Sequence, residues 1–210
     1  MQLVFDIETD GFLEDMTKCH VLVCQDVVTK KLYTFTDIKN GLDFMSNAVA
    51  LIGHNIIGFD LMALEKLYGW KPSPKTRLVD TWIMSQTLQF NRSHKHGLAG
   101  WGSYLGYKKM DNSEWAADGF KTYDPRMIDY CINDVKLNTK VYEVLLAELQ
   151  KAIEINDLIK KGLRVEHDVA EFEAVVRKTG WLFDLEKAQE NLRLMTRHMN
   201  KIESIIEPKL

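Results

Sequence analysis

The chain begins with MQLVFDIETD, residues 1–10, a short apolar run that ends in acids. This pattern predicts a strand that starts inside a core and ends at its surface. Side chains alternate along a strand, so Asp6 and Glu8 leave from one face and Phe5 and Ile7 from the other. Two carboxylates this close repel each other unless a cation or a proton neutralises them, and oxygen ligands favour magnesium or manganese over zinc. The alternative is a strand that simply ends in solvated acids.

The composition is that of an ordinary globular protein of 210 residues, long enough for one large domain or one domain with an appendage. The formal net charge is -3, so the chain has no excess of basic residues of the kind that many nucleic-acid binders show. This charge does not exclude nucleic-acid binding, because bound cations would offset a cluster of metal-binding acids. Three cysteines without a Cys-x-x-Cys pair argue against a disulfide framework and a cysteine zinc site. The sequence shows no signal peptide and no apolar run long enough to span a membrane, so we expect a cytoplasmic protein without a membrane partner.

The next segment alternates in the manner of strands. Residues 20–28 and 31–36 are expected to form two strands that continue the first one as an antiparallel meander. A helix over 37–47 and a fully buried strand over 48–53 follow. This order predicts a mixed sheet in which the meander joins parallel strands.

The buried strand ends in GHNIIGFD, residues 53–60. Glycines at both ends of this corner allow a tight turn or a close approach to a ligand, and Asp60 opens a helix that reaches residue 68. His54, Asn55 and Asp60 therefore follow the carboxyl end of a buried strand, where α/β proteins usually place a site. The alternative is a plain strand-to-helix turn capped by Asn55.

A fifth strand over 77–81 and a helix over 82–90 are expected, with Asp80 as a cap or a buried hydrogen-bond acceptor. The pair His94 and His96 does not favour zinc, because no second pair of ligands accompanies it at a suitable spacing. Residues 97–107 are expected to form a short helix that faces the core.

An irregular connection over 108–123, of a length that is often functional or mobile, precedes a helix expected over 125–152. Tyr130 and Asp134 lie four residues apart, so they share one face of this helix. On a solvated helix that pair would carry no meaning, but the apolar positions make most of this helix core-facing. Asp134 is therefore expected to be partly buried, and a buried carboxylate needs a partner. Two further helices are expected over 165–179 and 185–207, joined by a turn in which Asp184 caps the second.

The order of these elements resembles a known family. Asp6-Ile7-Glu8, the stretch from His54 to Asp60, and Tyr130-x-x-x-Asp134 resemble the three motifs of the DEDDy exonucleases of the RNase H-like superfamily. More narrowly, the chain resembles the proofreading domain of family A DNA polymerases of the T-odd phage type. Asp80-Thr81 and the segment 96–106 also resemble the phage proteins, and 164–184 resembles the segment that joins the exonuclease to the polymerase thumb.

The resemblance implies an α/β fold with an RNase H-like mixed five-stranded sheet, order 3-2-1-4-5, whose first three strands are antiparallel and which is flanked by helices. It also implies an exonuclease domain over 1–155 and a helical extension over 156–210, a hairpin resembling the start of the polymerase thumb. No palm or fingers sequence follows, so we expect an excised or naturally separate exonuclease portion without polymerase activity. A polymerase domain or subunit is its expected partner.

The resemblance further implies two Mg²⁺ or Mn²⁺ ions held by Asp6, Glu8, Asp60 and Asp134, with Tyr130 orienting the attacking water. The implied reaction removes nucleoside monophosphates from the 3′ end of single-stranded or frayed DNA. Residues expected to grip the terminal nucleotide are Ile7, Thr9, His54, Asn55 and Phe59.

Two other functions stay open. A DEDDy exoribonuclease would use the same chemistry on RNA, although the C-terminal helices that resemble a polymerase joint argue against it. A non-catalytic nucleic-acid-binding or docking module would keep the fold without the activity, but such modules usually lose one or more of the acids.

Overall fold

The structure is a computed structural model that describes residues 1–107, 110–113 and 119–206. It divides into two compact units, Met1–Ala174 and Val175–Leu210. The strands are β1 Gln2–Thr9, β2 Cys19–Asp26, β3 Leu32–Phe35, β4 Ala50–Gly53 and β5 Arg77–Asp80. The helices are α1 Ile38–Met45, α2 Asp60–Tyr68, α3 Thr81–Leu88, α4 Leu98–Tyr104, α5 Arg126–Ile155, α6 Leu158–Thr179 and α7 Leu185–Ile206.

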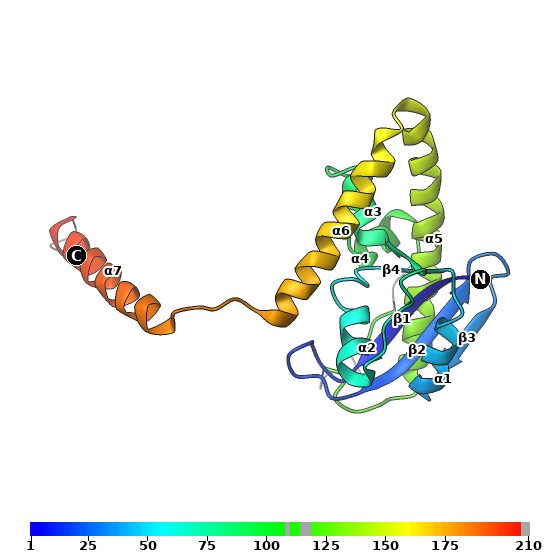
Figure 1. The fold of residues 1–210 in the computed structure, drawn as a ribbon, viewed down its shortest axis with the longest axis horizontal. Helices are drawn as coiled ribbons and strands as arrows, with labels where there is room; N and C mark the ends of the chain where they lie inside the picture. Colours follow the sequence, from blue (N-terminus) through cyan, green and yellow to red (C-terminus); the bar gives the residue numbers. More distant parts are fainter. Residues whose placement is uncertain (108–109, 114–118, 207–210) are drawn as a thin grey trace. The chain divides into compact units, whose positions relative to one another are not determined.

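The five strands form one sheet in the order β3-β2-β1-β4-β5, which confirms the expected topology. Figure 1 shows β1, β2 and β3 side by side in this sheet. The strands β1, β2 and β3 pair antiparallel, whereas β4 and β5 run parallel to β1. The carboxyl ends of β1, β4 and β5 therefore meet at one edge of the sheet. That edge is where ligands bind in open α/β sheets.

Helices cover both faces of this sheet, and the alternation along β1 decides which side chain meets which helix. Leu3, Phe5 and Ile7 belong to a core cluster that includes residues of α1 and α2. Val4 belongs to a second cluster on the other face, built with α3, α4 and α5. Burying each large apolar side chain contributes about 1.5–3 kcal/mol, so the sheet is fixed on both faces. Asp6 continues the face of Val4.

The long helix α5 packs across the second face. Pro125 precedes it, as expected, and the helix runs to Ile155, a few residues beyond the predicted end. Its buried side includes both Tyr130 and Asp134, so the prediction of a core-facing pair is confirmed.

The helix α6 begins at Leu158, seven residues before the predicted start at Val165. Leu163 packs against the second core cluster, and Ala170 and Ala174 pack against the first. Tertiary packing thus extends the helix through Gly162, which lowers local helix propensity. The first compact unit accordingly includes most of α6, whereas the expected domain boundary at 155/156 stays a prediction.

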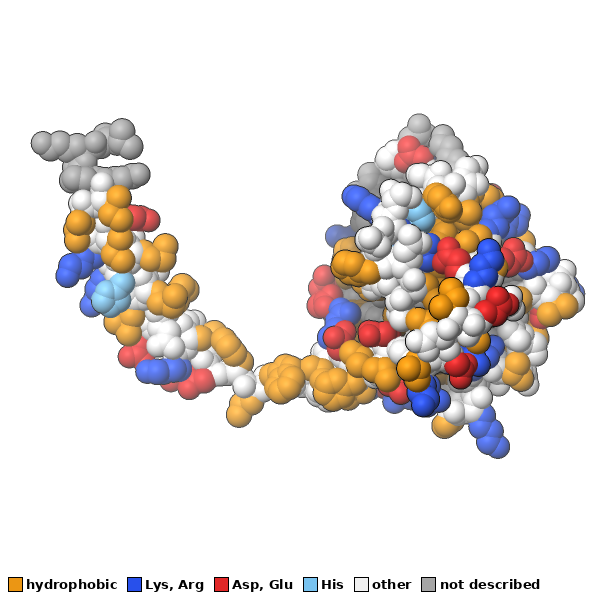
Figure 2. Space-filling model, turned by 90° about the horizontal axis from the view of Figure 1, so that it is seen from above, with side chains coloured by type: hydrophobic (Ala, Val, Ile, Leu, Met, Phe, Trp, Pro, Cys, Tyr) orange, Lys and Arg blue, Asp and Glu red, His pale blue; other side chains and the backbone are white. Residues whose placement is uncertain are grey.

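The second unit contains α7, and no residue of this helix is buried. Figure 2 shows hydrophobic side chains along its surface, between charged ones. The most exposed of them include Leu192, Met195, Ile205 and Ile206. Among the described residues, no helix combines the length and the apolar character that crossing a membrane requires.

The connection expected over 108–123 lies partly outside the described residues, at 108–109 and 114–118.

Candidate active site

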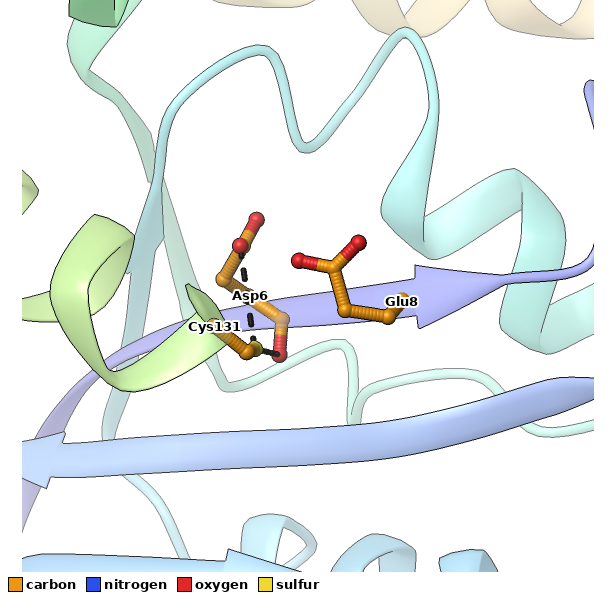
Figure 3. A group of neighbouring side chains, drawn as sticks. All are labelled: Asp6, Glu8 and Cys131. Carbon is orange, nitrogen blue, oxygen red and sulfur yellow. Dashed lines mark hydrogen bonds between the residues drawn. The ribbon is translucent and has the colours of Figure 1, made fainter. Parts of the chain in front are cut away.

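Asp6 and Glu8 project from β1 on the same side of the strand (Figure 3). Asp6 is half-buried, and Glu8 retains 9% of its exposure. Their neighbour Ile7 is buried in the core on the opposite face. The predicted alternation is therefore confirmed, and it delivers two carboxylates to one place near the end of the strand.

Asp60 opens α2 just beyond the end of β4, as predicted. The charge of Asp6 and the backbone of Ile7 both act on the pKa of Asp60, so its carboxylate lies near β1 at these two residues. The carboxyl retains only 4% of its exposure, and its Oδ1 has no hydrogen-bond partner among the described residues. Burial raises the pKa of Asp60 well above its ordinary 3.8, and the negative charge of Asp6 raises it further.

Two glycines allow the corner from β4 to α2 to turn so tightly. A Cβ on Gly53 would lie 2.0 Å from Ile56 Cγ2, and a Cβ on Gly58 would lie 2.5 Å from Asn55 Oδ1. Asn55 itself adopts a left-handed conformation with φ of 64°, which asparagine tolerates better than most residues. Asn55 does not cap α2, because the N-cap is Phe59 and no side chain caps it. The corner is thus a specific, tightly packed turn.

Asp80 holds this corner from the end of β5. Its Oδ1 accepts the amide of Asn55 at 2.9 Å, and its Oδ2 accepts the amide of Ile57 at 3.2 Å. The amides of Trp82 and Ile83 at the start of α3 also donate to Oδ1. The prediction of Asp80 as a helix cap and buried acceptor is therefore confirmed, and the same carboxylate ties two elements together.

The third element of the site is α5. Tyr130 retains 9% of its exposure and Asp134 retains 4%, one turn apart on the helix. Cys131 contacts β1 directly, because its thiol donates to the backbone oxygen of Asp6 at 3.4 Å and to Asp6 Oδ2 at 3.7 Å. Burial raises the pKa of the Cys131 thiol well above its ordinary value, and the charges of Asp6, Glu8 and Asp134 raise it further. The charges of these three acids therefore act on one thiol, although the acids come from two distant segments.

The sequence patterns assign no functional role to Cys131. It is buried and free, but its Sγ and the carboxylate oxygens of Asp6 and Glu8 lie within 4.8 Å of one another, so it belongs to the site. Its position directly after Tyr130 in the third motif is the signal that could have pointed to it.

His20 was also missed. The pairing of β1 with β2 shifts between Glu8 and Thr9 because His20 is an extra residue in β2, a bulge of the kind found beside active sites. Its Nε2–H donates to the carbonyl of Phe120 at 2.9 Å, and the ring of Phe120 lies 5.8 Å from that of Tyr130. His20 thus holds Phe120, which packs beside Tyr130. No local sequence pattern predicts the bulge.

The expected substrate-binding residues lie around the same edge in different environments. His54 Nδ1 lies 3.0 Å from Thr81 Oγ1. Phe59 is half-buried and packs against the first core cluster. The side chain of Ile7 is in the core, so only its backbone could contact a substrate, and Thr9 Oγ1 donates to the carbonyl of Gly11. Their roles in substrate binding stay predictions.

The arrangement fits a hard divalent cation. Within the described ranges, the buried Oδ1 of Asp60 has no hydrogen bond and feels the charge of Asp6, and a low-dielectric surrounding makes such repulsion costly. A cation would remove both penalties at once. Carboxylate oxygens are the ligands that Mg²⁺ and Mn²⁺ prefer.

Comparison with known sequences finds two phage relatives, although no family model matches the chain. The chain is 25% identical to the DNA-directed DNA polymerases of Escherichia phage T7 and Enterobacteria phage T3, over 90% of its own length. It spans about a third of the length of these relatives.

Comparison with solved structures finds nucleases. Brucella melitensis NrnC bound to pGG is similar with a TM-score of 0.63 and 19% identity, over 88% of each chain. The same protein with bound Mg²⁺ gives a TM-score of 0.61 and 18% identity, over 88% of this chain and 90% of that one. Escherichia coli RNase D, an exoribonuclease, gives a TM-score of 0.57 and 18% identity, over 81% of this chain and 45% of that one. The chain thus has the fold of the RNase H-like exonucleases.

Proposed function

We propose that this chain is a metal-dependent 3′ to 5′ exonuclease that removes nucleoside monophosphates from single-stranded or frayed DNA ends. The observation that carries the proposal is the gathering of acids from three elements at one sheet edge. Asp6 and Glu8 lie within 4.8 Å of the Cys131 thiol, and the charge of Asp134 also acts on that thiol. Asp60 feels the charge of Asp6, and its buried Oδ1 has no hydrogen-bond partner in the described part of the chain. A structural role would not need this many mutually repelling carboxylates.

Two Mg²⁺ or Mn²⁺ ions would be held by Asp6, Glu8, Asp60 and Asp134. Such ions, when bound, polarise the scissile phosphate and lower the pKa of the attacking water. The protein's own contribution is to fix the carboxylates beforehand. Cys131 donates its thiol to Asp6, and Asp80 holds the corner that leads to Asp60 by accepting the amides of Asn55 and Ile57.

Tyr130 would orient the attacking water through its hydroxyl group. A phenol with an ordinary pKa near 10 is a poor base at neutral pH, so positioning is the role that its chemistry supports. Tyr130 and Asp134 lie one turn apart on the buried side of α5, so both side chains leave the helix on the same side.

DNA is the proposed substrate because the sequence relatives are DNA polymerases. RNA is the second candidate because RNase D, which shares the fold, is an exoribonuclease. Half-buried His54 and Phe59, with Asn55 between them in the chain, are the proposed contacts to the terminal nucleotide, since unstacked bases favour aromatic faces. Digestion of DNA and RNA oligonucleotides of the same sequence, labelled at the 5′ end, decides between the two substrates.

A polymerase domain or subunit is the proposed partner, and the cytoplasm the proposed compartment. The relatives are about three times as long as the chain, and α7 has no buried residue of its own. The helical extension over 156–210 is therefore proposed as the start of the part that joins the polymerase.

The decisive experiment is the double substitution Asp6→Ala with Glu8→Ala, assayed with Mg²⁺ or Mn²⁺ on a labelled single-stranded oligonucleotide. We expect degradation to fall by at least about a hundredfold while the circular dichroism spectrum is unchanged. Glu14→Ala with Asp15→Ala is the matched control, because it removes two neighbouring exposed acids outside the site.

Wild-type activity in the site variant would refute the proposed function. A wild-type protein that shifts the oligonucleotide in a gel but never shortens it would instead favour the non-catalytic binding module.

A further inference from the structure

A histidine on α6 contacts the edge of the sheet at Asp80. The sheet order makes β5 an edge strand, so the outward amide of Asp80 has no strand partner. His167 Nε2 accepts this amide at 3.0 Å. Helix α6 is therefore joined to the sheet at the residue that also holds the corner before Asp60.

The tautomer of His167 follows from its two contacts. Nε2 accepts a hydrogen bond from an N–H group, so it carries no proton. Nδ1 lies 2.8 Å from the carbonyl oxygen of Leu163, which can only accept, so Nδ1 carries the proton. Both ring nitrogens are thus used, and the imidazole plane is fixed relative to α6.

The contact continues into the site through one carboxylate. Asp80 donates its amide to His167 and accepts the amides of Asn55 and Ile57 with its side chain. Those two residues lie in the corner that ends at Asp60, and the positive φ of Asn55 makes the corner depend on outside support. A shift of β5 at Asp80 would therefore move Asp60 away from Ile7 and Asp6.

We infer that His167 is a positioning residue of the nuclease site, which sets the place of the Asp60 carboxylate through Asp80 without touching metal or substrate. The inference rests on the proposed function for its kinetic consequences. It also assigns the first part of α6 to the nuclease unit. The helix completes the site's support and is more than a connection to the second unit.

A comparison of two variants, His167→Leu and His167→Gln, tests the inference. Leucine removes both hydrogen bonds, whereas the Oε1 of glutamine can replace Nε2 as the acceptor for the Asp80 amide. We expect kcat on a single-stranded oligonucleotide to fall about tenfold in His167→Leu, with a smaller change in KM, because a misplacement near 1 Å costs up to a hundredfold in rate. His167→Gln should recover most of kcat.

Two readouts do not depend on activity. Mn²⁺ binding, followed by electron paramagnetic resonance, should weaken in His167→Leu. Hydrogen exchange at the amides of Asn55 and Ile57 should become faster in the same variant. His198→Leu, the same substitution at an exposed histidine of α7, should leave both unchanged.

His167→Leu is measured well below its melting temperature. The inference is overturned if this variant keeps the wild-type kcat, the wild-type Mn²⁺ affinity and the wild-type rate of amide exchange. Nitrogen-15 spectra of the wild-type imidazole provide a test that needs no variant, because a proton on Nε2 would contradict the contact with Asp80. If the wild-type protein has no nuclease activity, the proposed function fails, while amide exchange and the tautomer still decide whether His167 supports the corner.

Discussion

Two buried aspartates at the same sheet edge, Asp60 and Asp80, differ in how their oxygens are satisfied. Asp80 retains 1% of its exposure, and both of its oxygens accept backbone amides. Asp60 retains 4%, and its Oδ1 accepts none from the described residues. Burial raises the pKa of both carboxyls, but four amides oppose the rise at Asp80, whereas the charge of Asp6 adds to it at Asp60. The comparison separates a carboxylate that serves the fold from one that the fold leaves open for a ligand.

The largest expected effect comes from Asp60→Asn. The amide lacks the charge that a divalent cation needs, so we expect the nuclease rate to fall by about a hundredfold or more. In EDTA the free energy of unfolding should stay the same or rise, because the repulsion with Asp6 is gone. Chemical denaturation together with the oligonucleotide assay measures both, and lost stability without lost activity would reverse the comparison.

Asp80→Asn should show the opposite pattern. An amide can keep an oxygen at the Oδ1 position, but its NH₂ group then faces the amide of Ile57, which loses its acceptor. We expect a loss of about 1–3 kcal/mol in the free energy of unfolding. Urea denaturation in EDTA measures this loss, and a variant as stable as the wild type would show that Asp80 does not hold the corner.

Tyr130→Phe removes only a hydroxyl group and leaves the four acids in place. The phenyl ring keeps its packing against Phe120. We expect kcat to fall about tenfold, since correct orientation of water is lost but metal binding remains. Single-turnover kinetics measures this step, and a loss as large as that of Asp60→Asn would assign Tyr130 a greater role.

The smallest expected effect concerns Asp26, whose Oδ1 accepts the amides of Val28 and Thr29 in the turn after β2. These bonds, led by that from Thr29, lower its pKa below the ordinary 3.8. The ionised form therefore stabilises the fold at neutral pH, and this contribution is lost as the pH falls through the lowered value.

Asp60 should behave with the opposite sign. Because its pKa is raised, its ionisation destabilises the metal-free fold as the pH rises above 3.8. Denaturation as a function of pH should show Asp26→Asn losing about 1 kcal/mol at pH 7 and less near pH 3. Asp60→Asn should gain relative to the wild type as the pH rises. Equal pH slopes in the two variants would contradict the contrast.

Much of the fold was readable from local patterns. Alternation placed Asp6 and Glu8 on one face of β1, and glycine spacing marked the corner before Asp60. The start of α6 was misjudged because Gly162 and the polar residues around it weaken the local helix signal, while the packing of Leu163 against distant residues decides it. The bulge at His20 and the contact of Cys131 with Asp6 could not be predicted from the sequence either, because each depends on a partner far away in the chain.

The sequence by itself determined the five strands and the acids that are candidates for the site. The order of the strands followed from the family resemblance. The tertiary structure alone decided that Asp80 also accepts the amides of Asn55 and Ile57, and that Asp60 Oδ1 has no partner among the described residues. The reason is physical: the role of Asp80 as a helix cap is local and can be predicted from the sequence, but partners from other segments cannot. Whether a carboxylate oxygen meets an amide depends on where folding brings other segments, here the turning of Asn55 and Ile57 towards Asp80 and the packing of α6 behind it.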